Sequence, residues 1–533
     1  MRRESDTATE ERPSLSRTTA ILVVVGTGLG VIMDGIDLSA VSMANPVLAV
    51  QLHTTLTDLQ WVTNGYVLAM AAALVFAGKL GDRYGHKRLF LIGLVGFAIS
   101  SLLVGASGGV HLMIFWRVVQ GAFGAVLIPT SLAILRLVFP PDQLKSAVGI
   151  WGAMVGLATA ASPLVGGVVV GTLGWRWVFF INVPIAAISF ALSARYVPRI
   201  RATRASAALD PLDAVLLALA LTGLLWGIIA GPVRGWTHPA VLTAFAVAVL
   251  ASAAFLVSET RSADPLIPLS LFRSRPLSGA MGVLVLSGLS AFGAIFFIAL
   301  YLQQVRGLSP LRAGFALLPV TALFMVGAPL GAQLNRRVGP RLPIAIGMVL
   351  LAVGGFGLSW VHPGTSINLV WPFLVLLGLG MGMAAPTSTE VVVSHAPKRH
   401  AGVASGLEHT AGMFGTSLGT AVFGTLILYR VGQSLAGDLT AAGVPPSVAE
   451  QVTRRAGEAA QGVAPVPTGV SADVKRQVAD AAHAAFLNGL DLAMLVAGAV
   501  ALLGAIVAWL FIRRAPGEPE AADVPAESDA PAA

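Results

Sequence analysis

The stretch Gly78-Lys-Leu-Gly-Asp-Arg-Tyr-Gly-His-Lys-Arg88 stands between two long apolar segments and follows the pattern GxLxDRxGxKR. Its glycines suit a place where two helix ends approach closely, and Asp82 and Arg83 are able to pair across a seam between domains. Its basic cluster holds a loop on the cytoplasmic side of a membrane. The stretch therefore predicts a cytoplasmic hinge loop between two spans, with hinge residues Gly78, Asp82, Arg83, Gly85, Lys87 and Arg88.

Composition places the chain in a membrane. Hydrophobic residues make up 56% of it, charged residues 11%, and the mean hydropathy is +0.80. Soluble domains are about one quarter charged. The 533 residues are taken up by apolar segments of about 20 residues, each able to cross roughly 30 Å of hydrocarbon. The sequence thus predicts an all-α integral membrane protein, with no stretch left for a soluble catalytic domain.

Fourteen such segments are predicted, and an even number puts both termini on the same side. They run over about 20–45, 58–79, 89–108, 112–138, 145–170, 177–197, 212–230, 239–258, 277–302, 312–335, 341–360, 369–393, 402–428 and 489–512. On this scheme the segments on the side of the termini hold 24 of the 34 Lys and Arg residues, whereas the short loops of the other side hold four. Because Lys and Arg accumulate in cytoplasmic loops, both termini are expected to be cytoplasmic.

Other features narrow the class of protein. The net charge of +8 indicates topology and contact with anionic lipid, and gives no reason to expect nucleic-acid binding. The absence of cysteine removes disulfides, thiol nucleophiles and thiolate metal sites. The first span lacks a small-residue cleavage site and is expected to be retained. No GxxxxGK[ST] pattern and no metal-ligand cluster is found, so no enzyme, no metal site and no ATP-driven step is predicted.

A family resemblance accumulates along the chain. Asp37-Leu-Ser-Ala-Val-Ser-Met-Ala-Asn-Pro46 resembles the DxTIVNVALP segment of the fourteen-span drug:proton antiporters of the QacA/EmrB type, in the major facilitator superfamily. Arg117-Val-Val-Gln-Gly121 is similar to their RxxQG motif, and Ser162-Pro-Leu-Val-Gly-Gly167 to their antiporter motif GPxxGG, with Ser162 where the family has Gly. Further similar segments are Gln60–Tyr66, Trp175–Pro184, Pro265–Arg273 and Gly307–Pro310.

The resemblance implies a proton-driven exporter with the major facilitator fold, two six-helix bundles and two inserted helices, working in the bacterial cytoplasmic membrane. A second, degenerate copy of the hinge motif at Gly331–Gly339 fits the internal repeat of such transporters. The expected parts are a disordered tail 1–19, an N-terminal bundle 20–200, an inserted pair with its loops 201–275, a C-terminal bundle 276–512 with an outer loop 429–488 of short surface helices, and a disordered tail 513–533.

Ionisable residues within the spans are the candidates for proton coupling, because they are costly in hydrocarbon and usually line a cavity or proton path. Asp34 and Asp37 share one helix face, and two carboxylates that close do not both ionise easily. Arg117 is expected at a similar depth, which predicts an Asp34/Asp37/Arg117 cluster in which either acid carries the proton. Glu408 is a second candidate, with contact to cytosolic water as the alternative. Ser162, Pro163, Gly166 and Gly167 are expected to form a bendable, closely packed seal.

The substrate pocket is less well determined by sequence. Pockets for amphipathic compounds are mostly apolar with few polar anchors, which favours Trp61, Asn64, Tyr66, Phe292, Phe296, Phe297 and Gln303. The favoured function is proton-coupled export of drugs or antibiotics, with protons, a small-molecule substrate and membrane lipid as partners, no cofactor and no obligatory protein partner. Export of an endogenous metabolite or lipid, and a non-transporting sensor, stay open. Substrate, proton stoichiometry and oligomeric state are not predicted.

Overall fold

The computed structural model describes residues 16–52, 54–198, 211–262, 265, 267–362, 364–397 and 401–512. Over these residues all regular structure is helical. The elements are α1 (Arg17–Gln51), α2 (Leu56–Tyr84), α3 (His86–Ala106), α4 (Val110–Val138), α5 (Pro141–Thr172), α6 (Arg176–Phe180), α7 (Asn182–Tyr196), α8 (Pro211–Arg234), α9 (Pro239–Arg261), η1 (Leu269–Arg273), α10 (Arg275–Leu300), η2 (Tyr301–Val305), α11 (Pro310–Val338), α12 (Arg341–Leu358), α13 (Ile367–His395), α14 (Ala401–Ala441), α15 (Pro446–Thr453), α16 (Ala456–Ala459) and α17 (Ala472–Phe511).

Twelve helical segments of the described residues are long and apolar enough to cross a membrane, with α6–α7 and α10–η2 each counting as one. The helices α2 and α5 are not among the twelve, although they have 29 and 32 residues and equal the others in length. The predicted all-helical membrane fold is confirmed. The predicted tail 1–19 is too long, because α1 begins at Arg17; residues 1–15 and the tail 513–533 lie outside the described residues.

Local sequence signals place the helix starts. At α2, the side chain of Thr55 accepts a hydrogen bond from the backbone N–H of Asp58, and the Asp58 carboxylate accepts one from the backbone N–H of Thr55. This reciprocal capping box satisfies two donors that the first helical turn leaves without partners. At α11, Ser309 caps the helix and Pro310 occupies its first turn, where a missing N–H costs nothing.

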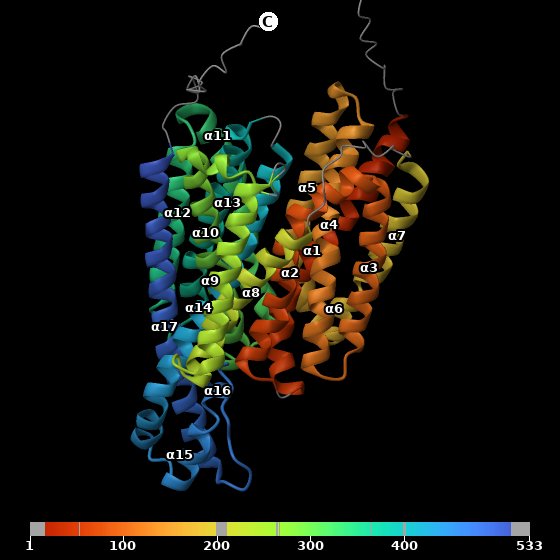
Figure 1. The fold of residues 1–533 in the computed structure, drawn as a ribbon. Helices are drawn as coiled ribbons and strands as arrows, with labels where there is room; N and C mark the ends of the chain where they lie inside the picture. Colours follow the sequence, from red (N-terminus) through yellow and green to blue (C-terminus); the bar gives the residue numbers. More distant parts are fainter. Residues whose placement is uncertain are drawn as a thin grey trace, which may run out of the picture.

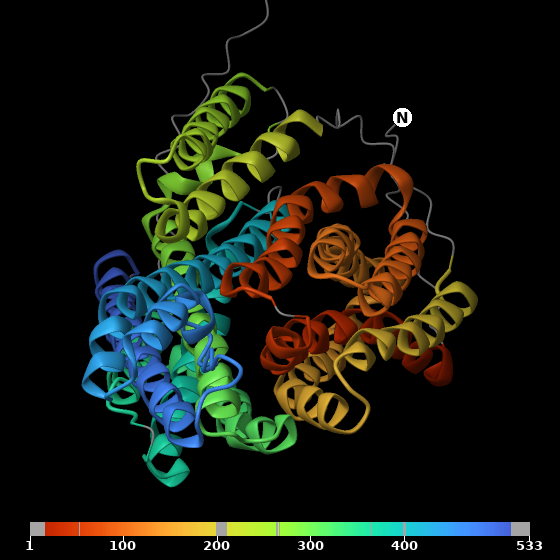
Figure 2. The ribbon, with the colours of Figure 1, turned by 90° about the horizontal axis from the view of Figure 1, so that it is seen from below.

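The helices form two halves that lie side by side (Figure 1). Seen from below, α1 to α7 make up one half, in red to yellow, and α10 to α17 make up the other, in green to blue (Figure 2). The start of α1 and the end of α17 lie at the same end of the molecule (Figure 1). The inserted helix α8 packs into the seam between α2 and α14, where Leu225 and Ile229 form a small apolar cluster with Leu68 and Ala421.

Two glycines reveal the internal repeat. Gly85 lies between α2 and α3 with φ 91°, and Gly339 lies between α11 and α12 with φ 82°. This backbone conformation favours glycine because other side chains are strained there. The two copies of the hinge motif therefore break the chain at corresponding positions.

The outer loop predicted over 429–488 is wrong in part. The short helices α15 and α16 are present, but α14 continues to Ala441 and α17 already begins at Ala472. With 41 and 40 residues, these two helices are each roughly 60 Å long, about twice the thickness of the hydrocarbon. Together with α15 and α16, their extensions make a helical cap at one end of this half (Figure 1).

Candidate functional site

A buried ion pair lies in the middle of the N-terminal half. The Arg117 guanidinium donates through Nη1 to the Asp37 carboxylate, and both side chains are fully buried. Asp37 Oδ1 also accepts hydrogen bonds from Gln120 Nε2 and Asn182 Nδ2, each at 3.1 Å. Three donors from α4 and α7 thus converge on one carboxylate of α1, which is how a buried negative charge is retained.

The arginine is held from several directions. Its Nε donates to the Val62 carbonyl oxygen at 3.0 Å, and its Nη1 also donates to Gln120 Oε1 at 2.9 Å. The guanidinium lies 4.1 Å from the ring centroid of Tyr66, a cation–π contact between two fully buried side chains. Among the described residues its Nη2 finds no hydrogen-bond acceptor.

Asp34 joins this network through a tyrosine. The Tyr66 hydroxyl donates to Asp34 Oδ1, and the same ring lies against Arg117. The predicted Asp34/Asp37/Arg117 cluster is therefore assembled, but only Asp37 contacts the arginine directly. Tyr66, expected in a substrate pocket, instead connects the two carboxylates. We call Asp34, Asp37, Tyr66, Arg117, Gln120 and Asn182 the buried polar cluster.

Helix spacing and one glycine bring the cluster together. Asp34 and Asp37 are three residues apart on α1, and Arg117 and Gln120 are three apart on α4, so each pair shares a helix face. A Cβ atom on Gly121 would overlap the backbone of Tyr66. The RxxQG segment therefore has two roles. Its glycine allows α4 to pack closely against α2, and its Arg117 and Gln120 side chains form hydrogen bonds with Asp37 of α1.

The sequence reasoning missed Gln120 and Asn182 as members of the site. Both lie inside segments that carry the family resemblance, Arg117–Gly121 and Trp175–Pro184, and both are fully buried. Each is an amide side chain within an apolar span, and a buried amide needs hydrogen-bond partners, so this feature of the sequence could have identified both residues as members of a polar site.

A small cavity lies between the two halves, with a volume of about 70 Å³. Its walls come from α1, α2 and α5 on one side and α10, α11, α13 and α14 on the other: Ser42, Thr63, Pro163, Phe292, Ile295, Phe296, Leu317, Val320, Thr321, Phe324, Met381, Thr416 and Thr420. The lining is largely apolar with a few hydroxyl groups. Pockets that hold drug-sized ligands have roughly 300–1,000 Å³, so a bound molecule of that size requires the halves to separate.

Of the predicted pocket residues, Phe292 and Phe296 line this cavity. Trp61 packs against the cluster around the inserted helix α8, and Phe297 is fully buried within the apolar core. Asn64 accepts a hydrogen bond from the Thr420 hydroxyl at 2.8 Å, across the seam between the halves. Gln303 donates to the Met43 carbonyl oxygen at 3.4 Å, another contact between the halves.

The Ser162–Gly167 segment forms a helix crossing between the halves. Ser162 is buried and Pro163 lies inside α5. A Cβ atom on Gly166 would approach Ala40 of α1 to 2.7 Å, and one on Gly167 would approach the Pro310 carbonyl oxygen of α11 to 2.6 Å. These glycines permit close packing of α5 on both neighbours, and a bendable seal at this crossing stays a prediction.

Glu408 lies in the other half, on α14. It is half-buried, and one carboxylate oxygen accepts a hydrogen bond from the Thr389 hydroxyl of α13. The neighbouring His409 has a buried Nε2 without a hydrogen-bond partner among the described residues. Glu408 thus faces a protein neighbour and is not part of the buried polar cluster.

The hinge stretch is not a loop, contrary to the sequence prediction. Residues 78–84, which include Asp82, continue α2, and α3 begins directly after Gly85. In this stretch only Gly85 has a positive φ, and this one residue turns the chain from one helix into the next. Arg83 is exposed and lies 5.7 Å from the ring of its neighbour Tyr84. Lys87 Nζ donates to the Ala194 carbonyl oxygen at 2.8 Å and to that of Val197, which ties the hinge to the end of α7. The structure does not describe the surroundings of Gly78 or of the Asp82 side chain, so the predicted pairing of Asp82 with Arg83 across a seam stays a prediction.

The arrangement defines a class of protein: a multi-pass membrane carrier with two helical halves around a central cavity and a charged network inside one half. The chain belongs to the Major Facilitator Superfamily, whose family model matches residues 27–420. Members of this superfamily carry small-molecule substrates across membranes.

Named relatives cover nearly the whole chain. It is 41% identical over 508 residues to the tetracenomycin C resistance and export protein of Streptomyces glaucescens, covering 95% of this chain and 94% of that one. It is 31% identical over 513 residues to the multidrug efflux pump LfrA of Mycolicibacterium smegmatis, covering 95% and 100%. A crystal structure of a bacterial homologue of the human lysosomal transporter Spinster has the same fold, with TM-score 0.62 and 16% identity over 92% of this chain and 98% of that one.

Proposed function

We propose that this protein is a proton-coupled antiporter of the fourteen-span QacA/EmrB type, which exports drugs or antibiotics by alternating access. The observation that carries the proposal is the buried ion pair of Asp37 and Arg117, on helices of the half that lines one side of the central cavity. Charged side chains are costly within a membrane, and they usually mark a substrate or ion pathway.

The chemistry follows from the hydrogen bonds. While Asp37 is ionised, it neutralises Arg117 and accepts from Gln120 and Asn182. A proton on Asp37 removes its charge and leaves the arginine without a counter-charge in a buried site, which costs several kcal/mol. The conformation with the intact pair is then disfavoured, so proton binding biases the equilibrium between conformations. Tyr66 passes the change to Asp34, because its ring lies against Arg117 and its hydroxyl bonds to Asp34.

The names of the relatives support export as the direction and antibiotics as the substrate class. Tetracenomycin C is therefore the first compound to test. The apolar lining of the cavity, with Phe292 and Phe296 on α10, suits an amphipathic molecule. Glu408 is proposed as a second acid that favours cationic substrates. No cofactor is proposed beyond the proton gradient.

The topology is part of the proposal. Counting α2 and α5 with the twelve apolar segments gives fourteen spans, and the distribution of Lys and Arg then puts both termini in the cytoplasm. The protein is placed in the bacterial cytoplasmic membrane. The cap of α15 and α16 lies on the outer side in this orientation.

The test is antiport in proteoliposomes with an imposed pH gradient. Addition of tetracenomycin C or of a panel of cationic dyes is expected to release protons with the wild-type protein and not with Asp37→Asn. Asp473→Asn is the matched control, because this carboxylate lies on the exposed start of α17, with 82% of its side chain accessible. Monodisperse elution from a sizing column establishes that each variant is folded.

Two outcomes would contradict the proposal. Proton release by a folded Asp37→Asn variant at the wild-type rate would remove Asp37 from coupling. Substrate movement that is indifferent to the pH gradient would remove antiport altogether. If no compound in the panel moves, an exporter of an endogenous metabolite or lipid becomes the better account.

A further inference from the structure

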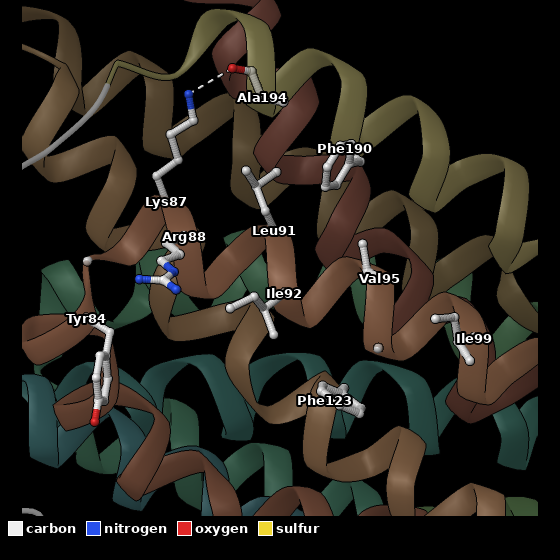
Figure 3. Close-up of a pocket in the computed structure, with 12 residues that line it drawn as sticks. Tyr84, Lys87, Arg88, Leu91, Ile92, Val95, Ile99, Phe123, Phe190 and Ala194 are labelled. Carbon is white, nitrogen blue, oxygen red and sulfur yellow. Dashed lines mark hydrogen bonds between the residues drawn. The ribbon is translucent and has the colours of Figure 1, made fainter.

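A second, larger groove lies on the outer face of the N-terminal half, away from the central cavity. It has a volume of about 960 Å³ and is bounded by α3, α4 and α7 (Figure 3). Its walls carry the apolar side chains Leu91, Ile92, Val95, Ile99, Phe123 and Phe190. The groove shares no lining residue with the central cavity and contains no member of the buried polar cluster, so it is a separate feature of the molecule.

One end of the groove is cationic. Lys87 is anchored there by the carbonyl oxygens of Ala194 and Val197, where α7 ends (Figure 3). Arg88 is exposed and its guanidinium lies on the opposite side, towards Tyr84 (Figure 3). Among the described residues that line the groove, none is acidic. This end of the groove therefore carries two positive charges, of which the exposed Arg88 guanidinium is accessible to an anionic group.

The length of the groove fits one leaflet of a membrane. The exposed residues Ile92, Val95 and Ile99 follow Arg88 along one face of α3 and are 48%, 45% and 53% accessible. The eleven helical steps from Arg88 to Ile99 span roughly 16 Å, about half of the 30 Å of hydrocarbon. An acyl chain that starts beside Arg88 therefore ends near the middle of the bilayer.

The floor of the groove is made by close packing of aromatic residues on α3. A Cβ atom on Gly96 would overlap the ring of Phe123, so glycine lets this ring lie flat against the helix. Phe190 of α7 stands on the other wall and is 39% accessible (Figure 3). The groove is thus recessed and apolar along its length, which suits a hydrocarbon chain.

The corresponding helix of the other half provides a comparison. A groove of about 450 Å³ lies along α12 and α17, lined by apolar residues such as Val349 and Leu510. The cation at its end, Arg341, lies 3.9 Å from the ring centroid of Trp509. This smaller groove therefore has its cation stacked on its own wall, whereas Arg88 of the larger groove is exposed.

We propose that the groove between α3, α4 and α7 is a binding site for one anionic glycerophospholipid. Its phosphate is held by the exposed Arg88 guanidinium, the nearby charge of Lys87 adds to the positive potential of this end, and one acyl chain lies along Ile92, Val95 and Ile99. Charge-assisted bonds from arginine to phosphate supply the headgroup preference. Because Lys87 and Arg88 lie in the first turn of α3, directly after Gly85, the lipid is bound at the break between α2 and α3.

The test is lipid retention by the full-length protein in detergent, measured by native mass spectrometry. Phosphatidylglycerol and phosphatidylcholine of the same chain length are added at equal concentration. We expect about tenfold tighter retention of one phosphatidylglycerol molecule. Arg88→Gln is expected to remove this preference. Arg336→Gln is the matched control, because Arg336 is an exposed cation in the last turn of α11 that does not line the groove.

A second variant tests the acyl chain separately from the charge. Val95→Trp fills the groove without altering its cations, and an exposed position tolerates the larger ring. It is expected to weaken binding of both lipids, whereas Arg88→Gln weakens only phosphatidylglycerol. Unfolding temperatures measured without lipid establish that each variant is folded.

Three results would overturn the proposal. Equal retention of both lipids by the wild-type protein would remove the headgroup preference. An equal loss in Arg88→Gln and Arg336→Gln would mean diffuse attraction to the basic surface. Displacement of phosphatidylglycerol by millimolar inorganic phosphate, with no effect of Val95→Trp, would mean an anion site without a lipid.

Discussion

Removing and restoring the charge balance of the buried ion pair is the sharpest test of the site. Asp37→Asn leaves the fully buried Arg117 without a counter-charge, and Arg117→Gln leaves Asp37 with only the amides of Gln120 and Asn182. Breaking a buried pair by removing one partner costs about 3–5 kcal/mol. Folded proteins are stable by about 5–15 kcal/mol, so each single variant is expected to be severely weakened.

The double variant Asp37→Asn/Arg117→Gln separates stability from transport. Both side chains are then neutral, and their amide groups are able to hydrogen bond to each other and to Gln120. Neighbouring sites couple by about 0.5–3 kcal/mol, and the charge pairing here places the expected coupling at the upper end, about 2–3 kcal/mol. The double variant should therefore be more stable than the sum of the two single losses, yet fail to move protons.

The assay is a double-mutant cycle of unfolding free energies in detergent, with proton release from proteoliposomes as the second measurement. Additive losses in the cycle would refute the pairing of Asp37 with Arg117. Wild-type proton release by the double variant would refute the coupling role and leave the pair a purely structural feature.

Three further predictions concern the seam between the halves and the second acid. Gly314→Leu is expected to abolish transport, because a Cβ atom at this position would lie 2.7 Å from the Pro163 carbonyl oxygen and keep α5 and α11 from packing closely where they cross. Drug uptake into everted vesicles measures the loss of transport, and normal uptake by this variant would contradict the prediction. Gln461 donates to the Thr54 carbonyl oxygen at 3.0 Å, a contact between the cap and the other half. In this cysteine-free protein, crosslinking the double variant Thr54→Cys/Gln461→Cys with a short thiol reagent should stop transport, and either single variant is the control. Unaltered transport after complete crosslinking would show that this contact does not open. Glu408→Gln should lower the transport of cationic dyes several-fold with a smaller effect on neutral compounds, and an equal effect on both would argue for a structural role.

Much of the fold could be predicted because membranes leave few choices. Apolar segments of about 20 residues and the bias of Lys and Arg depend on hydrophobicity and charge alone, which are properties of the sequence. Helix ends outside the hydrocarbon were harder. The extensions of α14 and α17 lack the continuous apolar run of a span and carry only an amphipathic pattern, in which Val431, Leu435 and Leu439 of α14 are buried in the core cluster.

The charged residues of the candidate site could be predicted, whereas its two amides were missed and its pattern of contacts could not be predicted. Asp37 and Arg117 follow from the cost of charge in hydrocarbon, and they do meet. The position of Tyr66 could not be predicted, because a tyrosine within a span suits a pocket, a lipid interface or a polar network equally well. The hinge shows the same limit: the motif Gly78–Arg88 indicates a break, but only the backbone shows that the break is one residue, Gly85.

The seam and the buried ion pair differ in strength, and this difference fits a carrier whose halves move as units. Across the seam, Gln60 Nε2 donates to the Thr420 carbonyl oxygen at 2.6 Å and the Thr420 hydroxyl to Asn64, both neutral hydrogen bonds. Such bonds contribute about 0.5–1.5 kcal/mol each, so a few of them together amount to the binding energy of a weak ligand. The charged pair of Asp37 and Arg117 lies wholly within one half, where breaking it costs more. In the proposed mechanism, opening the seam therefore breaks the weaker contacts first and keeps the buried polar cluster together until a proton neutralises Asp37.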